Sequence, residues 1–194
     1  MILFKYNSEK EIMVLKIQKD KNRSPETFAL FEKFITNADI DIDNPFILKH
    51  IKVVGENWNN VKDRFLNGLS KFYEVKLQEP DLTCYLTRTA IFPYNYKGDS
   101  QWFAAPMFGN PAEINRVIMH ELCHYLQPTK LPDYIKEAIP VILNDTKIFG
   151  SIGVEKGHLK DEAEQKWRKI IWDLYCEGKN YTDLLKFVEK EISN

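Results

Sequence analysis

Three features that would assign a protein to a broad class are missing from this chain of 194 residues. No window reaches the roughly 18 consecutive apolar residues of a membrane-spanning helix. The N-terminus lacks the basic segment and long apolar run of a signal peptide. Neither sign of charge dominates, because 27 basic and 28 acidic residues leave a formal net charge of −1. We therefore expect a cytoplasmic protein with no nucleic-acid or membrane partner.

Cysteine, internal repeats and low-complexity segments are also scarce or absent. Cys84, Cys123 and Cys176 are an odd number, widely spaced and without a C-x-x-C pair, so we expect reduced, buried thiols. The chain is 44% hydrophobic and 13% aromatic, which is typical of a globular protein with a well-filled core. We predict a single domain over residues 1–194, with a hairpin and helices in 1–78 and the motif-bearing part in 80–194.

The first part of the chain predicts a hairpin followed by helices. Residues 2–6 and 12–17 are short apolar runs separated by a polar segment, a pattern that predicts a β-hairpin. A serine or asparagine directly precedes Pro25 and Pro45. A capping residue before a proline is typical of a helix start. Apolar spacing predicts that the second helix extends to Phe72.

The pattern then changes to strands. Residues 82–87 and 89–92 are rich in β-branched and aromatic side chains, which favour strands. Residues 101–108 predict a further strand, and Pro106 indicates that this strand lies at a sheet edge. Asparagine before Pro111 predicts the start of another helix.

The last third of the chain predicts mainly helices. Residues 161–175 and 181–192 have amphipathic spacing, and Gly178 ends the first of these helices. Short strands followed by several helices predict an α+β fold with a small mixed sheet.

The clearest chemical signal is the segment His120-Glu121-Leu122-Cys123-His124. Residues four apart on a helix share one face, so the two imidazoles can bind the same metal ion. Glu121 can then act beside the metal as a general base without being a ligand. The flanking residues are largely apolar, and a buried helix seldom carries such groups without using them. Cys123 points away from this face and is predicted to pack in the core.

Catalytic zinc usually has three protein ligands, so the two histidines need a third. Glu137 is the best candidate, because the twelve residues that separate it from His124 allow one helix to end and another to return. His158, in a loop before a helix, is the alternative. The metzincin pattern is excluded, because it needs glycine and histidine where this chain has Gln127 and Lys130.

The motif together with the segment Leu131–Ala138 resembles the gluzincin-type zinc metallopeptidases of the peptidase MA-like group. Their pattern is H-E-x-x-H followed by a helix that opens with proline and supplies a glutamate. The resemblance implies a zincin-like fold in which His120, His124 and Glu137 bind Zn²⁺ and Glu121 is the general base.

The resemblance covers roughly residues 101–144 and departs from the family in three respects, one of which is a ligand spacing shorter than in the large thermolysin-like enzymes. Many members have glycine where this chain has Ala138, and Pro140 would disturb the second helix soon after it begins. Zincins carry an edge strand above the site, and the resemblance would place residues 102–108 there. An extended peptide could add to such a strand through main-chain hydrogen bonds.

Other residues are candidates for supporting roles. Asp145 could orient a ligand histidine, since metal-bound imidazoles usually donate their other N–H to a carboxylate or carbonyl. The oxyanion of a tetrahedral intermediate needs a donor. The candidate donors are His158, Tyr94, Tyr96, Tyr134 and Tyr181.

Two functions follow as hypotheses. The first is a zinc-dependent peptidase that cleaves short peptides or unfolded proteins, with Glu121 activating water. The second is a zincin-like binding protein whose metal is structural or absent. The complete motif argues against the second, because a structural site has no use for Glu121. Ala138 argues mildly for it.

Overall fold

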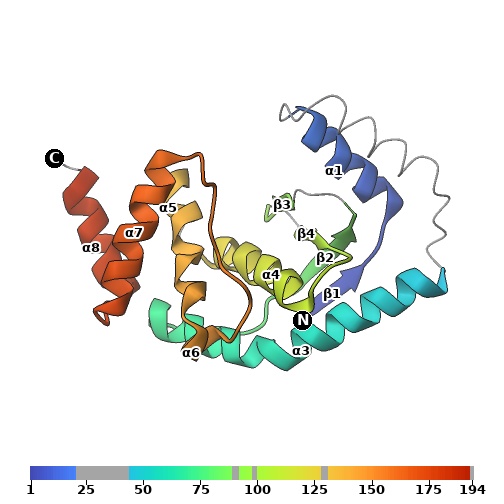
Figure 1. Ribbon diagram of the computed structural model, residues 1–194, viewed down its shortest axis with the longest axis horizontal. Helices are drawn as coiled ribbons and strands as arrows, with labels where there is room; N and C mark the ends of the chain where they lie inside the picture. The colour runs from blue at the N-terminus through green and yellow to red at the C-terminus, as the bar shows by residue number, and fades with distance from the viewer. Residues whose placement is uncertain (21–43, 89–91, 98–99, 128–130, 193–194) are drawn as a thin grey trace. The chain divides into compact units, whose positions relative to one another are not determined.

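The computed structural model describes residues 1–20, 44–88, 92–97, 100–127 and 131–192, shown as a ribbon in Figure 1. The helix predicted to begin at Pro25 and most of the strand predicted over 89–92 lie outside these ranges. The chain forms two compact units. Unit 1 comprises Met1–Asn59 and Pro80–Val117, and unit 2 comprises Asn60–Glu79 and Ile118–Asn194.

Unit 1 is built on a four-stranded mixed sheet. Its strands are β1 (Ile2–Lys5), β2 (Leu82–Thr87), β3 (Tyr94–Asn95) and β4 (Trp102–Pro106), in the order β1-β2-β4-β3. The β1–β2 and β2–β4 pairs are parallel, and β3 is antiparallel to β4. The protein therefore has the predicted α+β architecture with a small mixed sheet.

Helix α1 (Ser8–Asp20) covers one face of this sheet. Val14 is fully buried against Trp102 and Ala104 of β4. Alternate residues of a strand point to opposite faces, and these two strand residues are two apart, so α1 packs on the face that they share. This cluster provides the apolar burial that holds α1 in place.

Helix α3 (Pro45–Tyr73) lies against the opposite face of the sheet in unit 1. Phe4, Cys84 and Phe103 occupy one row across β1, β2 and β4. A Cβ atom at Gly55 of α3 would lie 3.6 Å from the Phe4 ring. Because this row alternates with the one under α1, the sheet is a middle layer between two helices.

The predicted N-terminal hairpin is wrong. Residues 2–5 form β1, but residues 12–17 belong to α1. The side chain of Asn7 explains the difference, because its Oδ1 accepts a hydrogen bond from the Lys10 amide at 2.8 Å and so caps the helix. An apolar run of six residues does not by itself distinguish a strand from a buried helix segment.

The prediction that residues 101–108 form an edge strand is also wrong. β4 lies between β2 and β3 in the sheet order, and among the described residues β3 pairs with Trp102 and Phe103. Pro106 is the last residue of β4, and the Met107 amide donates to the Thr87 carbonyl at 2.8 Å. A proline at the end of a strand therefore removes no needed donor from the sheet.

Unit 2 is helical in the described part of the chain. Helix α4 (Pro111–Leu126) begins in unit 1, as α3 does, and continues into unit 2. The later elements are α5 (Asp133–Ala138), the 3₁₀ helix η1 (Ile139–Asn144), α6 (Thr146–Phe149), α7 (Glu162–Cys176) and α8 (Tyr181–Ile192). The disturbance predicted from Pro140 is the change from α5 to η1, because proline has no amide hydrogen to continue the α-helix.

The predicted helix starts at Pro45 and Pro111 and the predicted stop at Gly178 are confirmed. Asn44 Oδ1 accepts from the Phe46 amide, and Asn110 Oδ1 accepts from the Ala112 amide, each at 2.9 Å. Gly178 follows α7 with a φ of 78°. Such a conformation favours glycine and ends a helix.

In unit 2, the last turns of α3 pack closely on α6. A Cβ atom at Gly68 would come within 2.5 Å of Ile148 Cγ2 and 2.8 Å of Phe149 Cε1, so only glycine fits there. Arg64 donates to the carbonyl oxygens of residues 146–148 at 2.7–3.2 Å. This arginine therefore supplies partners for the carbonyls at the end of α6.

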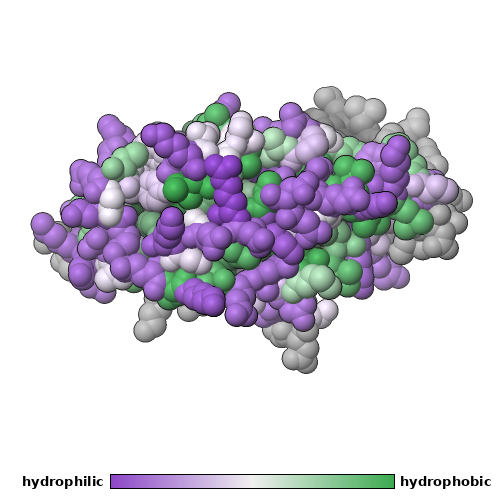
Figure 2. Space-filling model, turned by 90° about the horizontal axis from the view of Figure 1, so that it is seen from below, coloured by the Kyte–Doolittle hydropathy of each residue, from purple (hydrophilic) through white to green (hydrophobic). Residues whose placement is uncertain are grey.

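The surface mixes charged and apolar residues. Figure 2 shows one face on which hydrophilic side chains alternate with small hydrophobic areas. Cys84 and Cys123 are fully buried as predicted, but Cys176 is exposed, which corrects the expectation for this third thiol. Among the described residues, no helix is both long and apolar enough to cross a membrane.

Candidate metal centre

The two histidines of the motif lie together on α4 within unit 2. Their ring centroids are 4.6 Å apart and the ring planes meet at 81°. The two Nε2 atoms are 2.8 Å apart. The four-residue spacing on one helical turn produces this arrangement, and both rings present the same nitrogen to a common point.

Glu137 of α5 supplies a third atom to the same point. Its Oε2 lies 3.1 Å from His124 Nε2 and 3.7 Å from His120 Nε2. These separations leave a point about 1.9 Å from all three atoms, so an ion just outside their plane could reach each at the roughly 2.0–2.2 Å typical of zinc. Two imidazoles and one carboxylate also match a known catalytic zinc ligand set. The three predicted ligand residues therefore fit the metal.

The electrostatics of these residues are strongly coupled. Burial lowers the pKa of His120, but the adjacent carboxylates of Glu137 and Glu155 outweigh this and raise it to about 10. Burial would raise the pKa of Glu137, yet His120 and His124 hold it well below its ordinary value. An anionic Glu137 beside the imidazoles is the state suited to binding a cation.

Glu121 lies on α4 next to His120 and is buried. Burial raises the pKa of its carboxyl group to about 8; the charges of Glu137 and Glu155 add to the increase and His120 opposes it. In its ionised form, a carboxylate with a raised pKa is a stronger base than an exposed glutamate. This is the property that the predicted general base requires.

The sequence interpretation missed Glu155, which is 3% exposed. Its Oε2 lies 3.3 Å from His120 Nδ1, on the side of the ring away from the other ligands. A carboxylate in this position fixes the orientation of a ligand imidazole. Glu155 lies in irregular backbone between α6 and α7, so no periodic pattern marks it. The only usable signal was the general need of a ligand histidine for such a partner.

Asp145, the residue predicted for that partner role, has a different one. Its Oδ1 accepts from the amides of Lys147 and Ile148 at 3.0 and 3.3 Å and caps α6. Its Oδ2 accepts from the Tyr175 hydroxyl at 3.1 Å. Both oxygens are used in local structure, so the prediction for Asp145 is wrong.

His158, the alternative third ligand, is not part of the ligand group. Its side chain is 68% exposed, and its Nδ1 lies 2.7 Å from Glu164 Oε2. Within the part of the chain that the structure describes, the group of three residues able to hold a metal is His120, His124 and Glu137. The geometry therefore favours Glu137 over His158.

The candidate tyrosines are divided between the two units. Tyr94 and Tyr96 stack on each other in unit 1, with ring centroids 4.6 Å apart. In unit 2, Tyr134 packs near Trp167, and Tyr181 is buried in an aromatic cluster. Neither hydroxyl of this second pair is recorded in contact with the three ligand residues, so the donor for an oxyanion stays unassigned.

The described residues thus bring together four of the side chains singled out from sequence and add Glu155. A carboxylate base, two imidazoles and a carboxylate ligand can together bind a cation and activate water beside it. Comparisons with protein-family models, with curated proteins and with solved structures found no match to this chain.

Proposed function

We propose that the protein is a zinc-dependent peptidase with a zincin-like fold. The observation that carries this proposal is that His120, His124 and Glu137 converge. Each offers one ligand atom, and these three atoms lie within 4.8 Å of one another. Bound Zn²⁺ would supply Lewis-acid chemistry, which polarises a carbonyl group and lowers the pKa of water. Zinc is favoured over magnesium or calcium because two of the three ligands are imidazoles.

The residues of the chain perform the remaining chemistry. Glu121 accepts a proton from the attacking water and delivers it to the leaving amine. Its burial supports this role, because a water-excluded carboxylate interacts more strongly with a developing positive charge. Glu137 stays anionic and holds the centre together with the two histidines. Short peptides or unfolded proteins are the proposed substrates.

Removal of the base tests the proposal. Glu121→Gln should lower the rate of peptide cleavage by about 10²–10⁴-fold while the protein keeps one zinc per chain, because the general base is lost and the ligands are not. Glu113→Gln is the matched control, since it changes a more exposed glutamate on the same helix. Metal analysis of purified protein and a peptide-library assay with a chelator provide the readouts.

The competing function is a binding protein whose metal is structural or absent. The observation in its favour is that Glu137 Oε2 lies 3.1 Å from His124 Nε2 and 3.7 Å from His120 Nε2, distances at which a protonated imidazole can pair with the carboxylate directly. Absence of zinc from purified protein, together with no uptake on titration, would support it. Zinc binding with chelator-insensitive cleavage, or with full activity of Glu121→Gln, would also overturn the peptidase mechanism.

A further inference from the structure

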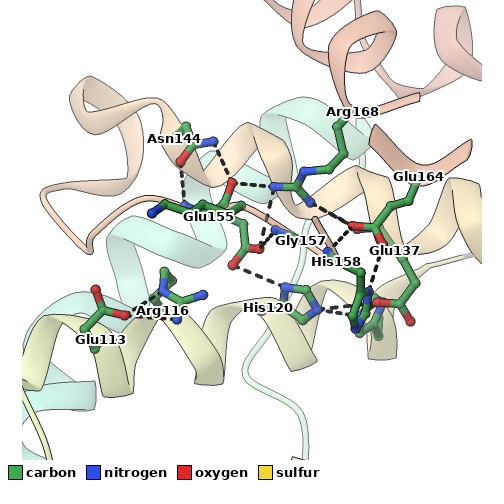
Figure 3. A network of polar contacts seen from close by, with 12 residues as sticks. Glu113, Arg116, His120, Glu137, Asn144, Glu155, Gly157, His158, Glu164 and Arg168 are labelled. Atoms are coloured by element: carbon green, nitrogen blue, oxygen red, sulfur yellow. Dashed lines mark hydrogen bonds and ion pairs between the residues drawn. The ribbon is translucent and has the colours of Figure 1, made fainter. Parts of the chain in front are cut away.

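An irregular segment over residues 150–160 connects α6 to α7 and carries Glu155; we call it the strap. Asn144 holds its backbone at that residue by two hydrogen bonds: the Glu155 amide donates to Asn144 Oδ1 at 2.8 Å, and Asn144 Nδ2 donates to the Glu155 carbonyl at 3.1 Å. Figure 3 shows Glu155 of the strap between His120 and Arg168. The position of the strap thus sets the position of the carboxylate beside His120.

Arg168 of α7 connects the strap to the third ligand. Its Nη1 donates to the carbonyl oxygen of Glu137 at 3.2 Å, and its Nη2 donates to the carbonyl oxygen of Glu155. The same guanidinium lies 3.6 Å from the carboxylates of Glu155 and Glu164. A single buried side chain therefore contacts both the backbone of a ligand and the residue that orients another ligand.

The two carboxylate oxygens of Glu155 face different partners. Oε2 faces His120 Nδ1, while Oε1 accepts from the Gly157 amide at 3.0 Å and faces Arg168. Both sides present hydrogen-bond donors when His120 binds through Nε2. A glutamine has one acceptor oxygen only, so it would place an N–H group against a donor on one side.

The backbone of the strap is shaped to fit this contact. Gly157 has a φ of 62°, and a Cβ atom there would collide with Glu164 Oε1 and come within 2.7 Å of Arg168 Nη1. Glu164 also accepts from the His158 amide at 3.0 Å. Carboxylates of α7 and of the strap therefore surround the guanidinium, and only glycine allows this approach.

We propose that Arg168 and Glu155 form a clasp that positions the metal ligands: Glu155 fixes the ring of His120, and Arg168 holds Glu155 and the backbone of Glu137 in register. The proposal rests on the proposed zinc site. Neither residue contacts the ion or the substrate, so both are positioning residues. Loss of such partners typically weakens metal affinity by about 10–100-fold.

Four variants test the clasp. Arg168→Met removes the donors, and Arg168→Lys keeps the charge but cannot donate along two directions in one plane. Glu155→Gln changes one acceptor. Arg64→Met is the matched control, because Arg64 also donates to backbone carbonyls in unit 2 but contacts only residues 146–148.

The readouts are zinc affinity by competition with a chelating dye, and the visible spectrum of the Co²⁺-substituted protein, which reports ligand geometry. We expect a 10–100-fold loss of affinity and an altered spectrum in Arg168→Met and Glu155→Gln. We expect partial recovery in Arg168→Lys and no change in Arg64→Met. Circular dichroism identifies variants that fail to fold. If Arg168→Met fails to fold, the results for Arg168→Lys and Glu155→Gln test the clasp instead.

Unchanged affinity and spectrum in folded Arg168→Lys and Glu155→Gln would overturn the clasp. Equal losses in Arg64→Met would overturn it too, because they would reflect general destabilisation. If the wild-type protein bound no zinc, the proposed function itself would fail. Hydrogen exchange at the Gly157 and His158 amides of metal-free protein tests the clasp separately from zinc binding. Arg168→Lys should speed this exchange only if the clasp holds the strap.

Discussion

Each unit of the protein buries a carboxylate–guanidinium pair, and the two pairs differ in how completely they are matched. In unit 1, Glu11 is fully buried and Arg88 donates to both of its oxygens at 2.7–3.2 Å, with the Tyr6 hydroxyl at 2.8 Å. In unit 2, Arg168 lies 3.6 Å from the carboxylates of Glu155 and Glu164. The first pair is closed on itself, while the second continues to His120.

The balance of charge separates the two networks more sharply than their distances do. Glu11 and Arg88 cancel, which is how a buried ion pair is normally tolerated. Around His120, the carboxylates of Glu121, Glu137 and Glu155 contribute to its electrostatics, and Arg168 is the guanidinium that contacts this group in the described residues. Carboxylates grouped around one imidazole favour a positive charge there. Although burial lowers the pKa of His120, they raise it to about 10, so the ring holds a proton near neutral pH. The pair in unit 1 therefore has its charges balanced within itself, whereas the carboxylates in unit 2 surround the imidazoles of the proposed zinc site.

The largest expected effect is loss of zinc in Glu137→Ala. Removal of a ligand should weaken zinc binding by more than the roughly 10–100-fold cost of losing an outer partner. The metal-free fold should survive, because the deleted carboxylate is 27% exposed and water can take its place beside the histidines. Equilibrium dialysis with zinc and denaturant unfolding of metal-free protein measure the two effects. Retention of wild-type affinity would exclude Glu137 as a ligand.

The next effect concerns the closed pair in unit 1. Arg88→Met should lower the free energy of unfolding by about 3–5 kcal/mol, because it leaves Glu11 buried without its cation. Zinc affinity of the folded protein should stay at the wild-type value. Replacement of both residues, Glu11→Leu with Arg88→Met, should recover most of the stability. Denaturant unfolding and zinc titration of the same samples distinguish this network from the one around Arg168.

The core of the candidate site was predictable from sequence because its geometry is local. His120 and His124 share a face because residues four apart on a helix always do. Glu137 lies on α5, the next helix along the chain after α4. Glu155 was not predictable, because its place beside His120 depends on the path of the strap and on Arg168, which lies 13 residues further along the chain. Side chains held by irregular backbone leave no periodic signal.

The fold was predicted in class but not in detail. The helix starts marked by asparagine and proline were correct, since Asn44 and Asn110 cap through contacts within two residues. The pattern of residues 12–17 fits a strand or a helix, because its five apolar residues around Lys16 satisfy either period, and the cap at Asn7 decides between them. Pro106 was read as an edge signal, although at the end of β4 it removes no donor that the sheet uses.

A smaller effect is the pH dependence of zinc binding. Zinc binds the neutral imidazole, so the raised His120 pKa of about 10 means that binding near neutral pH releases its proton. Affinity should therefore rise by about tenfold per pH unit above pH 7 for this proton, until the pKa is passed. Calorimetry in buffers of different ionisation enthalpy counts the protons. Glu155→Gln removes a carboxylate that raises this pKa, so zinc affinity of the variant should stop rising at a lower pH than in wild type. The same pH dependence in variant and wild type would refute this electrostatic account.

The smallest effect is expected from His158→Ala. The side chain of His158 is mostly exposed and contacts Glu164 rather than the ligand group. Glu164 keeps its hydrogen bond from the backbone amide of residue 158 and its position beside Arg168 after the substitution. Zinc affinity should therefore stay within about twofold of wild type, since the mostly exposed imidazole contacts the buried carboxylate of Glu164 and an ion pair with one exposed partner contributes little. The same dialysis that measures Glu137→Ala tests this contrast. If His158→Ala lost zinc while Glu137→Ala kept it, the third ligand would be His158, and Glu137 would serve only as an ion-pair partner of the two histidines.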